Sequence, residues 1–280
     1  MDAGRRFFLQ RTALICAAAS TPLSLAAAGE AATLAKTRSG RIAGYRDHGV
    51  HVFKGIPYGA HTAPQRFRPA LQESAWRGVR DATQHGASAP QNGNDGPGSE
   101  DCLFLNVYTP GLRDGGKRPI LFYIHGGGFN NGSGSSPLYD GVRLCRRGDV
   151  VVVTVNHRLN AFGYLYLAEL GGEELQRSGN VGQLDLVQAL QWVQRHATEF
   201  GGDAGNVTVF GQSGGGAKIA TLMAMPATVG LFHRAMTMSG QQVTAAGPRA
   251  ATQRTRLLLE TLKIAPHEID RLRTLPMEGI

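Results

Sequence analysis

The chain has 280 residues, of which 42% are hydrophobic and 18% charged, and its formal net charge is +8. This composition supports a buried core and excludes a chain that is disordered by composition. Glycine stands out with 38 residues, roughly twice its usual share of about 7%. The glycines follow no Gly-X-Y period, which excludes a collagen, and three cysteines are too few for a disulfide scaffold.

The first residues have the features of a targeting segment. Arg5-Arg6-Phe7-Phe8-Leu9 resembles a twin-arginine export signal, and an apolar run over 12–25 leads to Ala26-Ala27-Ala28, a small-x-small cleavage pattern. We therefore expect residues 1–28 to be an export signal and residues 29–280 to be periplasmic or secreted. An uncleaved membrane anchor is the alternative. The apolar run is shorter than the roughly 20 residues that span a bilayer, so we expect no stable membrane insertion after cleavage.

The remaining positive charge is scattered over the mature chain. Arg146-Arg147 and the Arg271/Arg273 pair are typical of solvated helix faces, and no aromatic stacking motif accompanies them, so we expect no nucleic-acid binding. Two cysteines follow the signal, Cys102 and Cys145. Sequence alone cannot tell whether they pair, and we favour two free or buried thiols.

Apolar runs alternate with helical patterns along the mature chain. Strands are predicted at 41–45, 50–53, 103–108, 120–124, 150–155, 207–210 and 235–238, and helices at 181–199, 214–225, 252–262 and 267–275. A Pro- and Gly-rich stretch over 55–98 is too long for a plain connector and is expected to bind or cover something. The alternation predicts one α/β domain, a mostly parallel sheet with helices on both faces.

The strongest chemical signal is a serine between two glycines. Gly211-Gln212-Ser213-Gly214-Gly215 follows a predicted strand and opens a predicted helix, the context of a Gly-x-Ser-x-Gly nucleophile. Side chains at the flanking glycines would collide with the neighbouring strand and helix, and the turn itself is strained. A phosphate-binding loop needs Lys directly after Gly216 and then Ser or Thr, but Lys218 comes one place late. A chance Gly/Ser turn is the other alternative.

A second signal follows the predicted strand at 120–124, where His125-Gly126-Gly127-Gly128-Phe129 places three glycines in a row. Such a loop can present bare backbone N–H groups to an oxyanion, together with the N–H of the residue after the nucleophile. The candidate donors are Gly127, Gly128 and Gly214. We expect His125 to support this loop rather than to act as the catalytic base. A flexible turn is the alternative.

Together these motifs resemble the type-B carboxylesterase/lipase family of α/β-hydrolases, which is related to the cholinesterases. The resemblance covers residues 37 to 241 and rests on a series of motifs in one order: Phe53-Lys54-Gly55-Ile56-Pro57-Tyr58, Arg66-Phe67-Arg68-Pro69, Ser99–Val107, His125–Phe129, Asn156-His157-Arg158-Leu159, Gly179–Asp185, Phe200-Gly201-Gly202-Asp203 and the serine turn. It implies hydrolysis of small-molecule carboxylic esters through an acyl-serine intermediate, with no cofactor and no metal.

The resemblance also implies roles for single residues. Ser213 corresponds to the nucleophile, and Gly127, Gly128 and Gly214 correspond to the oxyanion donors. Gln212, Asp185 and Ser239 are expected to support the site without taking part in the chemistry, Asp185 as a structural residue. Glu100 and Asp101 match scaffold residues, which are expected in salt bridges or caps.

Three departures from the family pattern concern the residue beside the serine, a disulfide and the class of substrate. Gln212 stands where many members carry Glu beside the serine, and Ala89 stands where many carry a cysteine that bridges to the Cys102 position. Cys102 is therefore expected to be unpartnered. The segment 92–99 has no aromatic residue, whereas the cholinesterases place a cation-binding Trp there, so a cationic choline-like substrate is disfavoured.

The fourth departure concerns the catalytic acid and histidine, which follow the serine and further strands in the family order. Only residues 214–280 follow here, and their acids and histidines, except His233, fall on or beyond the two last predicted helices. We therefore expect the chain to be the N-terminal part of a longer member, with the C-terminal part of the fold, the acid and the base missing, and to be inactive or nearly so by itself.

Two other functions stay open at the level of sequence. Some relatives are non-catalytic interaction modules, but these typically lose the serine that is present here at 213. An amidase or thioesterase could use the same fold and the same nucleophile. The acyl and alcohol groups of the substrate and the oligomeric state cannot be read from the sequence.

Overall fold

The computed structural model describes residues 33–92, 98–242 and 244–280. Contacts divide the chain into two units, Met1–Ala31 and Ala32–Ile280, and every described residue belongs to the second unit. The expected export signal at 1–28 therefore lies outside the described residues.

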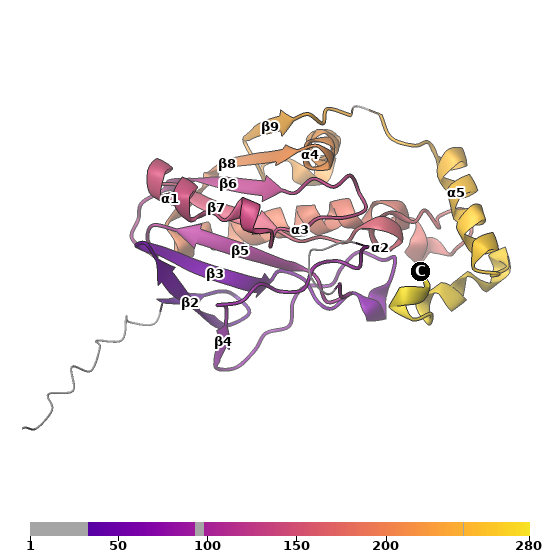
Figure 1. Cartoon of the computed structure of the whole chain (residues 1–280), viewed down its shortest axis with the longest axis horizontal. Helices are drawn as coiled ribbons and strands as arrows, with labels where there is room; N and C mark the ends of the chain where they lie inside the picture. The colour runs from indigo at the N-terminus through magenta and orange to yellow at the C-terminus, as the bar shows by residue number, and fades with distance from the viewer. Residues whose placement is uncertain (1–32, 93–97, 243) are drawn as a thin grey trace, which may run out of the picture. The chain divides into compact units, whose positions relative to one another are not determined.

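A sheet of nine strands forms the centre of the described part (Figure 1). The strands are β1 (Thr33–Lys36), β2 (Arg41–Asp47), β3 (Val50–Pro57), β4 (Val79–Asp81), β5 (Phe104–Thr109), β6 (Arg118–Ile124), β7 (Val151–Val155), β8 (Gly202–Gln212) and β9 (Arg234–Met238). Their order across the sheet is β1-β2-β3-β5-β7-β6-β8-β9, with β4 paired to β2. The seven predicted strands are all present, while β1 and β4 were not predicted.

The sheet is mixed rather than mostly parallel. Strands β7, β6, β8 and β9 run parallel to one another, as predicted, whereas every pairing along the path from β1 to β7 is antiparallel. The prediction therefore holds for the half of the sheet that leads to Ser213 and has to be corrected for the other half. A strand buried on both faces shows the same apolar run in either direction, so the pattern did not reveal the orientation.

Helices cover both faces of the sheet, as predicted. They are α1 (Val142–Gly148), α2 (Asn160–Tyr164), α3 (Val181–His196), α4 (Gly214–Ala224) and α5 (Pro248–Thr261). Side chains of α3 and α4, such as Trp192 and Ile219, pack with Phe122 of β6 in the main core. On the opposite face, Val142 and Cys145 of α1 pack with other strand residues. Alternate residues of β7 point to opposite faces of the sheet and pack in the two clusters, as expected for a buried strand.

The predicted helices differ in how closely they match. α3 continues as a 3-10 turn over Ala197–Phe200 and stops where Gly201 takes a φ of 66°, a common way for glycine to end a helix. α5 begins four residues earlier than predicted, with a proline in its first turn. The predicted helix over 267–275 is a 3-10 segment, Pro266–Arg273. Helices α1 and α2 are too short for a clear periodic pattern and were not predicted.

The C-terminal elements pack on a separate apolar cluster, in which Leu259 and Leu272 contact Phe67 and its neighbours. Arg66 fastens this segment, because its Nη1 donates to the carbonyl oxygens of Leu272 (3.0 Å) and Leu275 (2.6 Å). The same guanidinium forms a buried ion pair with Glu100. The expected salt-bridge role of Glu100 is thus confirmed.

Cys102 and Cys145 are both free and buried, as favoured from the sequence. Burial raises the pKa of both thiols, that of Cys145 to about 12, which keeps them protonated and unreactive. Among the helices of the described residues, none combines the length and the apolar character needed to cross a membrane.

Candidate active site

The carboxyl ends of three parallel strands meet at one edge of the sheet. Ile124 at the end of β6 pairs with Gly211, and Gln212 at the end of β8 pairs with Met238 at the end of β9. The residues that follow these strands therefore lie together, as ligand-binding loops do in open α/β sheets. The structure thus brings the glycine loop, Ser213 and Ser239 to the same edge.

Ser213 occupies a strained turn between β8 and α4. Its backbone has φ 54° and ψ −121°, which a residue with a Cβ adopts only at a cost of about 1–3 kcal/mol. The turn is held from the next strand, since the Ser213 N–H donates to the carbonyl oxygen of Met238 at 2.7 Å. Its side chain is half-buried, and within the described part of the chain no residue forms a hydrogen bond with its hydroxyl.

The two glycines that flank the serine are needed for close packing, as predicted. A Cβ on Gly215 would lie 2.1 Å from the carbonyl oxygen of Ile124, and one on Gly211 would lie 2.5 Å from the same oxygen. Both distances are far below van der Waals contact with backbone that cannot swing away. The Gly-x-Ser-x-Gly pattern therefore reflects how tightly β8 and α4 approach β6.

The glycine loop after β6 packs directly on the serine turn. A Cβ on Gly214 would lie 2.2 Å from the oxygen and 2.6 Å from the nitrogen of Gly128. Gly127 and Gly128 have φ of 82° and 60°, a region that favours glycine, and both are at least partly exposed. No described residue accepts a hydrogen bond from either N–H. The three candidate donors thus lie close together beside Ser213, with Gly214 at the positive end of α4.

Several contacts that the sequence did not predict hold the loop in place. The side chain of Gln91 exchanges two hydrogen bonds with the backbone of Gly132, at 2.7 and 3.0 Å. The N–H of Asn160 donates to the carbonyl oxygen of Phe129 at 2.7 Å, and the Phe129 ring meets Tyr164 edge to face at 5.0 Å. Gln91 lies in the predicted covering stretch over 55–98, so part of that stretch supports the site.

Two stacked histidines lie behind the loop. The rings of His125 and His157 are 4.8 Å apart and nearly parallel. Each Nδ1 lies 2.9 Å from the next residue's carbonyl oxygen, so Nδ1 carries the proton and donates, which leaves each buried Nε2 without a described partner. Burial, and then the charge of Lys218, lowers the pKa of His125 to about 3, and that of His157 falls well below its usual value. Both are neutral and weakly basic, which fits the supporting role expected for His125.

Lys218 is a buried residue of the site that sequence reasoning missed. It lies on α4 and is fully buried. Its ammonium donates to the carbonyl oxygen of His125 at 3.3 Å and lies 5.5 Å from the centre of the Phe129 ring. Burial lowers its pKa to about 7. From the sequence, the position of this lysine indicated only that the turn is not a phosphate-binding loop.

The three residues expected to support the site differ in what they contact. Asp185 of α3 is fully buried and forms a two-pronged ion pair with Arg158, at 2.6 and 2.8 Å, so it has the structural contacts expected of it. Gln212 is exposed beside the serine. Ser239 is exposed with a φ of 55°, and Gly240 after it packs so closely that a Cβ would lie 1.9 Å from the Ser213 carbonyl oxygen.

The acidic and histidine residues after the serine lie on other elements. Glu260 is on α5, and His267, Glu268 and Asp270 are on the 3-10 segment Pro266–Arg273 that packs on the separate apolar cluster. His233 precedes β9 and accepts a hydrogen bond from the Val207 N–H through Nδ1 at 3.2 Å. That contact lies next to the start of β9, at the opposite end of the β8–β9 pairing from Gln212 and Ser213.

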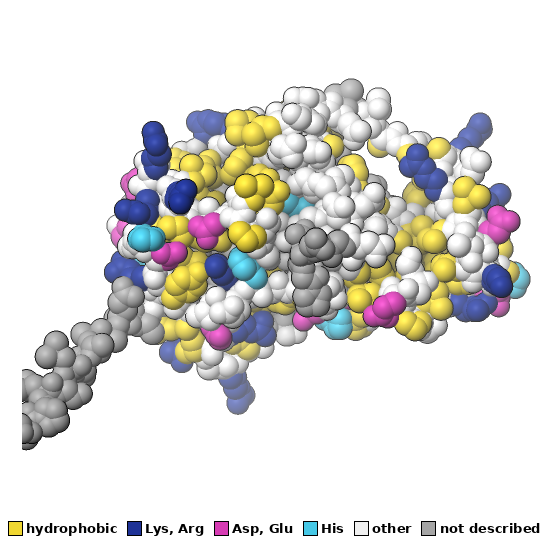
Figure 2. Space-filling model, in the orientation of Figure 1, with side chains coloured by type: hydrophobic (Ala, Val, Ile, Leu, Met, Phe, Trp, Pro, Cys, Tyr) yellow, Lys and Arg dark blue, Asp and Glu magenta, His cyan; other side chains and the backbone are white. Residues whose placement is uncertain are grey.

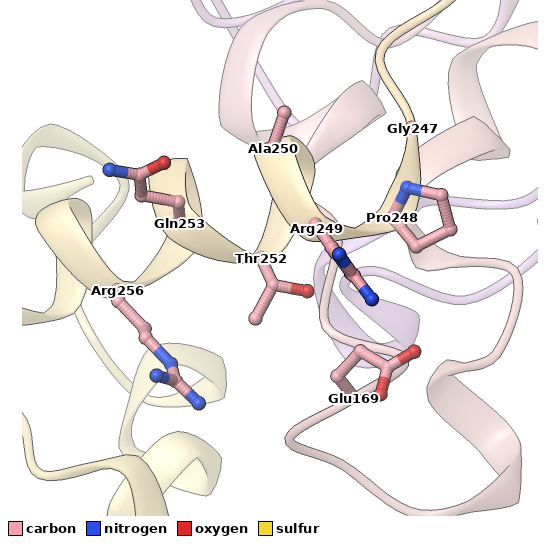
Figure 3. A pocket seen from close by; sticks show the side chains of 8 residues that line it. All are labelled: Glu169, Gly247, Pro248, Arg249, Ala250, Thr252, Gln253 and Arg256. Carbon is pink, nitrogen blue, oxygen red and sulfur yellow. The ribbon is translucent and has the colours of Figure 1, made fainter.

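A hollow of about 940 Å³ lies beside the first turns of α5 (Figure 3). In that view Arg249, Thr252 and Glu169 point toward the same space. Its lining includes neither Ser213 nor the glycine loop. It is an open surface feature without the nucleophile, and the strand-end site is therefore the better candidate.

Within the described residues, the basic side chains of the drawn face and the metal-ligating side chains are dispersed. On the face drawn in Figure 2, Lys and Arg side chains are spread over separate places and form no continuous basic strip. Among the described residues no group of three or more His, Cys, Asp or Glu side chains could hold a metal ion.

A serine in a strained strand-to-helix turn, with a glycine loop from the neighbouring parallel strand against it, defines an α/β-hydrolase. Solved structures support this class: the chain matches a carboxylesterase of Geobacillus stearothermophilus with a TM-score of 0.85 and 44% identity, over 88% of this chain and 52% of that one. Residues 31–274 match the sequence model of the Carboxylesterase family. The chain belongs to the carboxylesterase family.

Curated relatives carry the names of ester hydrolases. The chain is 41% identical to the para-nitrobenzyl esterase of Bacillus subtilis strain 168, over 87% of this chain and 51% of the relative. It is 39% identical to the phenmedipham hydrolase of Pseudarthrobacter oxydans, over 88% and 50% respectively. The chain thus spans about half the length of the curated relatives it matches.

Proposed function

We propose that the whole protein is a serine carboxylesterase that uses Ser213 as its nucleophile. The observation that carries the proposal is the Ser213 turn, with Gly127, Gly128 and Gly214 packed around it. The Ser213 Oγ attacks the ester carbonyl carbon and gives up its proton to a base, while the three N–H groups stabilise the oxyanion. The alcohol then leaves with a proton, and water hydrolyses the acyl-serine to release the acid and restore the hydroxyl.

The mechanism needs a base that takes the proton of the Ser213 hydroxyl and an acidic residue that orients this base. No described residue forms a hydrogen bond with the Ser213 hydroxyl, and the relatives are about twice as long as the matched region. We propose that the base and the acid come from the part of the whole protein that corresponds to the relatives' other half. The 280-residue chain alone is then expected to lose activity on the order of a million-fold.

Hydrolysis of a short p-nitrophenyl ester tests the proposal. The protein expressed from its complete coding sequence should turn the ester over, and Ser213→Ala should reduce kcat on the order of a million-fold. Ser74→Ala, at an exposed serine in a loop, is the matched control and should keep full activity. Equal turnover by the Ser213→Ala variant would refute the role of the serine. An amidase or thioesterase would instead show higher kcat/KM on the matched amide or thioester.

We propose further that residues 1–28 direct export and are then removed. The support is the Arg5-Arg6 pair before an apolar run and a small-residue cleavage pattern. Mass spectrometry of the protein from the periplasmic fraction should find a mature chain that begins at Gly29. Replacing both arginines with lysine should keep the protein in the cytoplasm. A chain that still begins at Met1 outside the cytoplasm would contradict the proposal.

A further inference from the structure

The position of Lys218 cannot be explained as ordinary core packing. Its side chain is fully buried, and no carboxylate of the described residues pairs with it. Burying an ammonium without a counter-charge is unfavourable for folding, and the energy is recovered only in part by one 3.3 Å hydrogen bond and an aromatic ring. An apolar side chain would stabilise this place better. A lysine here therefore points to a role other than stability.

Both contacts of the ammonium are made to the glycine loop. His125, whose carbonyl oxygen accepts the hydrogen bond, is the residue before the three glycines, and Phe129, whose ring lies near the ammonium, is the residue after them. Lys218 therefore holds the loop at both ends. Gly126, Gly127 and Gly128 between them have no side chains of their own to fix their conformation.

The helix that carries Lys218 also carries the other half of the candidate site. Ser213 caps α4, Gly214 is its first residue, and Lys218 follows one turn later. α4 is in turn fixed to α3, since the side-chain amide of Gln183 donates to the Lys218 carbonyl oxygen at 3.1 Å. One side chain thus connects the loop with two of the candidate donors to the helix with the third donor and the nucleophile.

We propose that Lys218 is a positioning residue that sets the glycine loop against the N-terminus of α4, so that the N–H groups of Gly127, Gly128 and Gly214 converge on one oxyanion. The inference rests on the proposed function of this site. The groups that face the ammonium, His125 and His157, are neutral, so its charge is uncompensated on the side of the loop.

Lys218→Met tests this role, because it keeps the length of the stem and removes the donor and the charge. We expect kcat to fall by about ten- to a hundred-fold, somewhat less than the loss of one oxyanion donor, with KM changed less than about threefold. The free energy of unfolding should not fall, which separates positioning from packing. Lys218→Gln, which can donate without a charge, should recover part of kcat. Unchanged kcat in Lys218→Met, or folding lost in both variants, would overturn the proposal.

Hydrogen–deuterium exchange of residues 125–132 gives a readout that does not depend on turnover. Lys218→Met should raise exchange in this segment at least about tenfold. Lys54→Met is the matched control, because that ammonium lies 5.4 Å from the Tyr45 ring, away from the loop, and exchange at 125–132 should stay unchanged. If the unaltered protein hydrolyses no ester, the proposed function fails, while equal exchange in Lys218→Met and the unaltered protein would refute the role of Lys218.

Discussion

Replacing Asp185 with Asn should destabilise the fold strongly without changing the chemistry. Asp185 is fully buried, and its two oxygens accept hydrogen bonds from the Arg158 side chain at 2.6 and 2.8 Å, while the Arg158 N–H donates to it at 3.1 Å. An amide cannot balance the guanidinium charge, and removing one partner of a buried pair costs about 3–5 kcal/mol. Urea unfolding of the whole protein, followed by the change in free energy of unfolding, measures this loss.

The chain offers a close control for this substitution. Asp149 pairs with Arg118 at the same 2.6 Å, but the Asp149 side chain is 74% exposed. Its φ of 47° is tolerated by asparagine, so Asp149→Asn changes only the charge, and we expect a loss of about 0–1 kcal/mol. Replacing both buried partners, as Arg158→Met with Asp185→Leu, should recover most of the loss. A loss below about 1 kcal/mol for Asp185→Asn would refute the reasoning.

Two further predictions follow from close contacts and from burial. Gly215→Ala should lower the free energy of unfolding by about 1–3 kcal/mol and lower kcat, because its Cβ would lie 2.1 Å from a carbonyl oxygen. Gly172→Ala is the control and should change neither quantity, because the nearest atom to its Cβ is 3.7 Å away; urea unfolding and ester turnover check both variants. The folded pKa of Lys218, about 7, lies below the unfolded value of about 10.4, so the unfolded chain binds more protons between them. The free energy of unfolding should therefore rise from pH 7 to 10, less so in Lys218→Met, and equal slopes in urea titrations would contradict this.

The parts of the fold that could be predicted are those with a strong local pattern. α3 carries an apolar stripe at helical spacing over four turns, and β6, which leads to the glycine loop, contains a continuous apolar run over 120–124. Gly211 and Gly215 could be predicted as essential because the close approach they allow is a local consequence of a strand-to-helix turn. In these elements the local preference of the sequence agrees with the conformation found in the fold, so the local pattern was enough to predict them.

The parts that could not be predicted depend on distant segments. The antiparallel half of the sheet has buried strands whose pattern is the same in both directions. Asp185 and Arg158 are 27 residues apart, and no local signal shows that they pair. From the sequence, Lys218 could be recognised only as a lysine that does not fit the phosphate-binding pattern. Its contacts, His125 and Phe129, follow the end of another strand and are distant in the sequence.

The described half of the candidate site is built mainly from backbone. The three candidate donors are N–H groups of glycines, and their places are set by φ values and by contacts below 3 Å that only glycine permits. Because backbone dipoles need no reorganisation when charge develops, such a site stabilises an oxyanion without ionised side chains. In the proposed mechanism Ser213 supplies the nucleophile, and within the described residues Lys218 places the only ammonium against the loop. Under the proposed function, variants that add a Cβ to these glycines should therefore impair turnover more than variants of nearby exposed side chains such as Gln212.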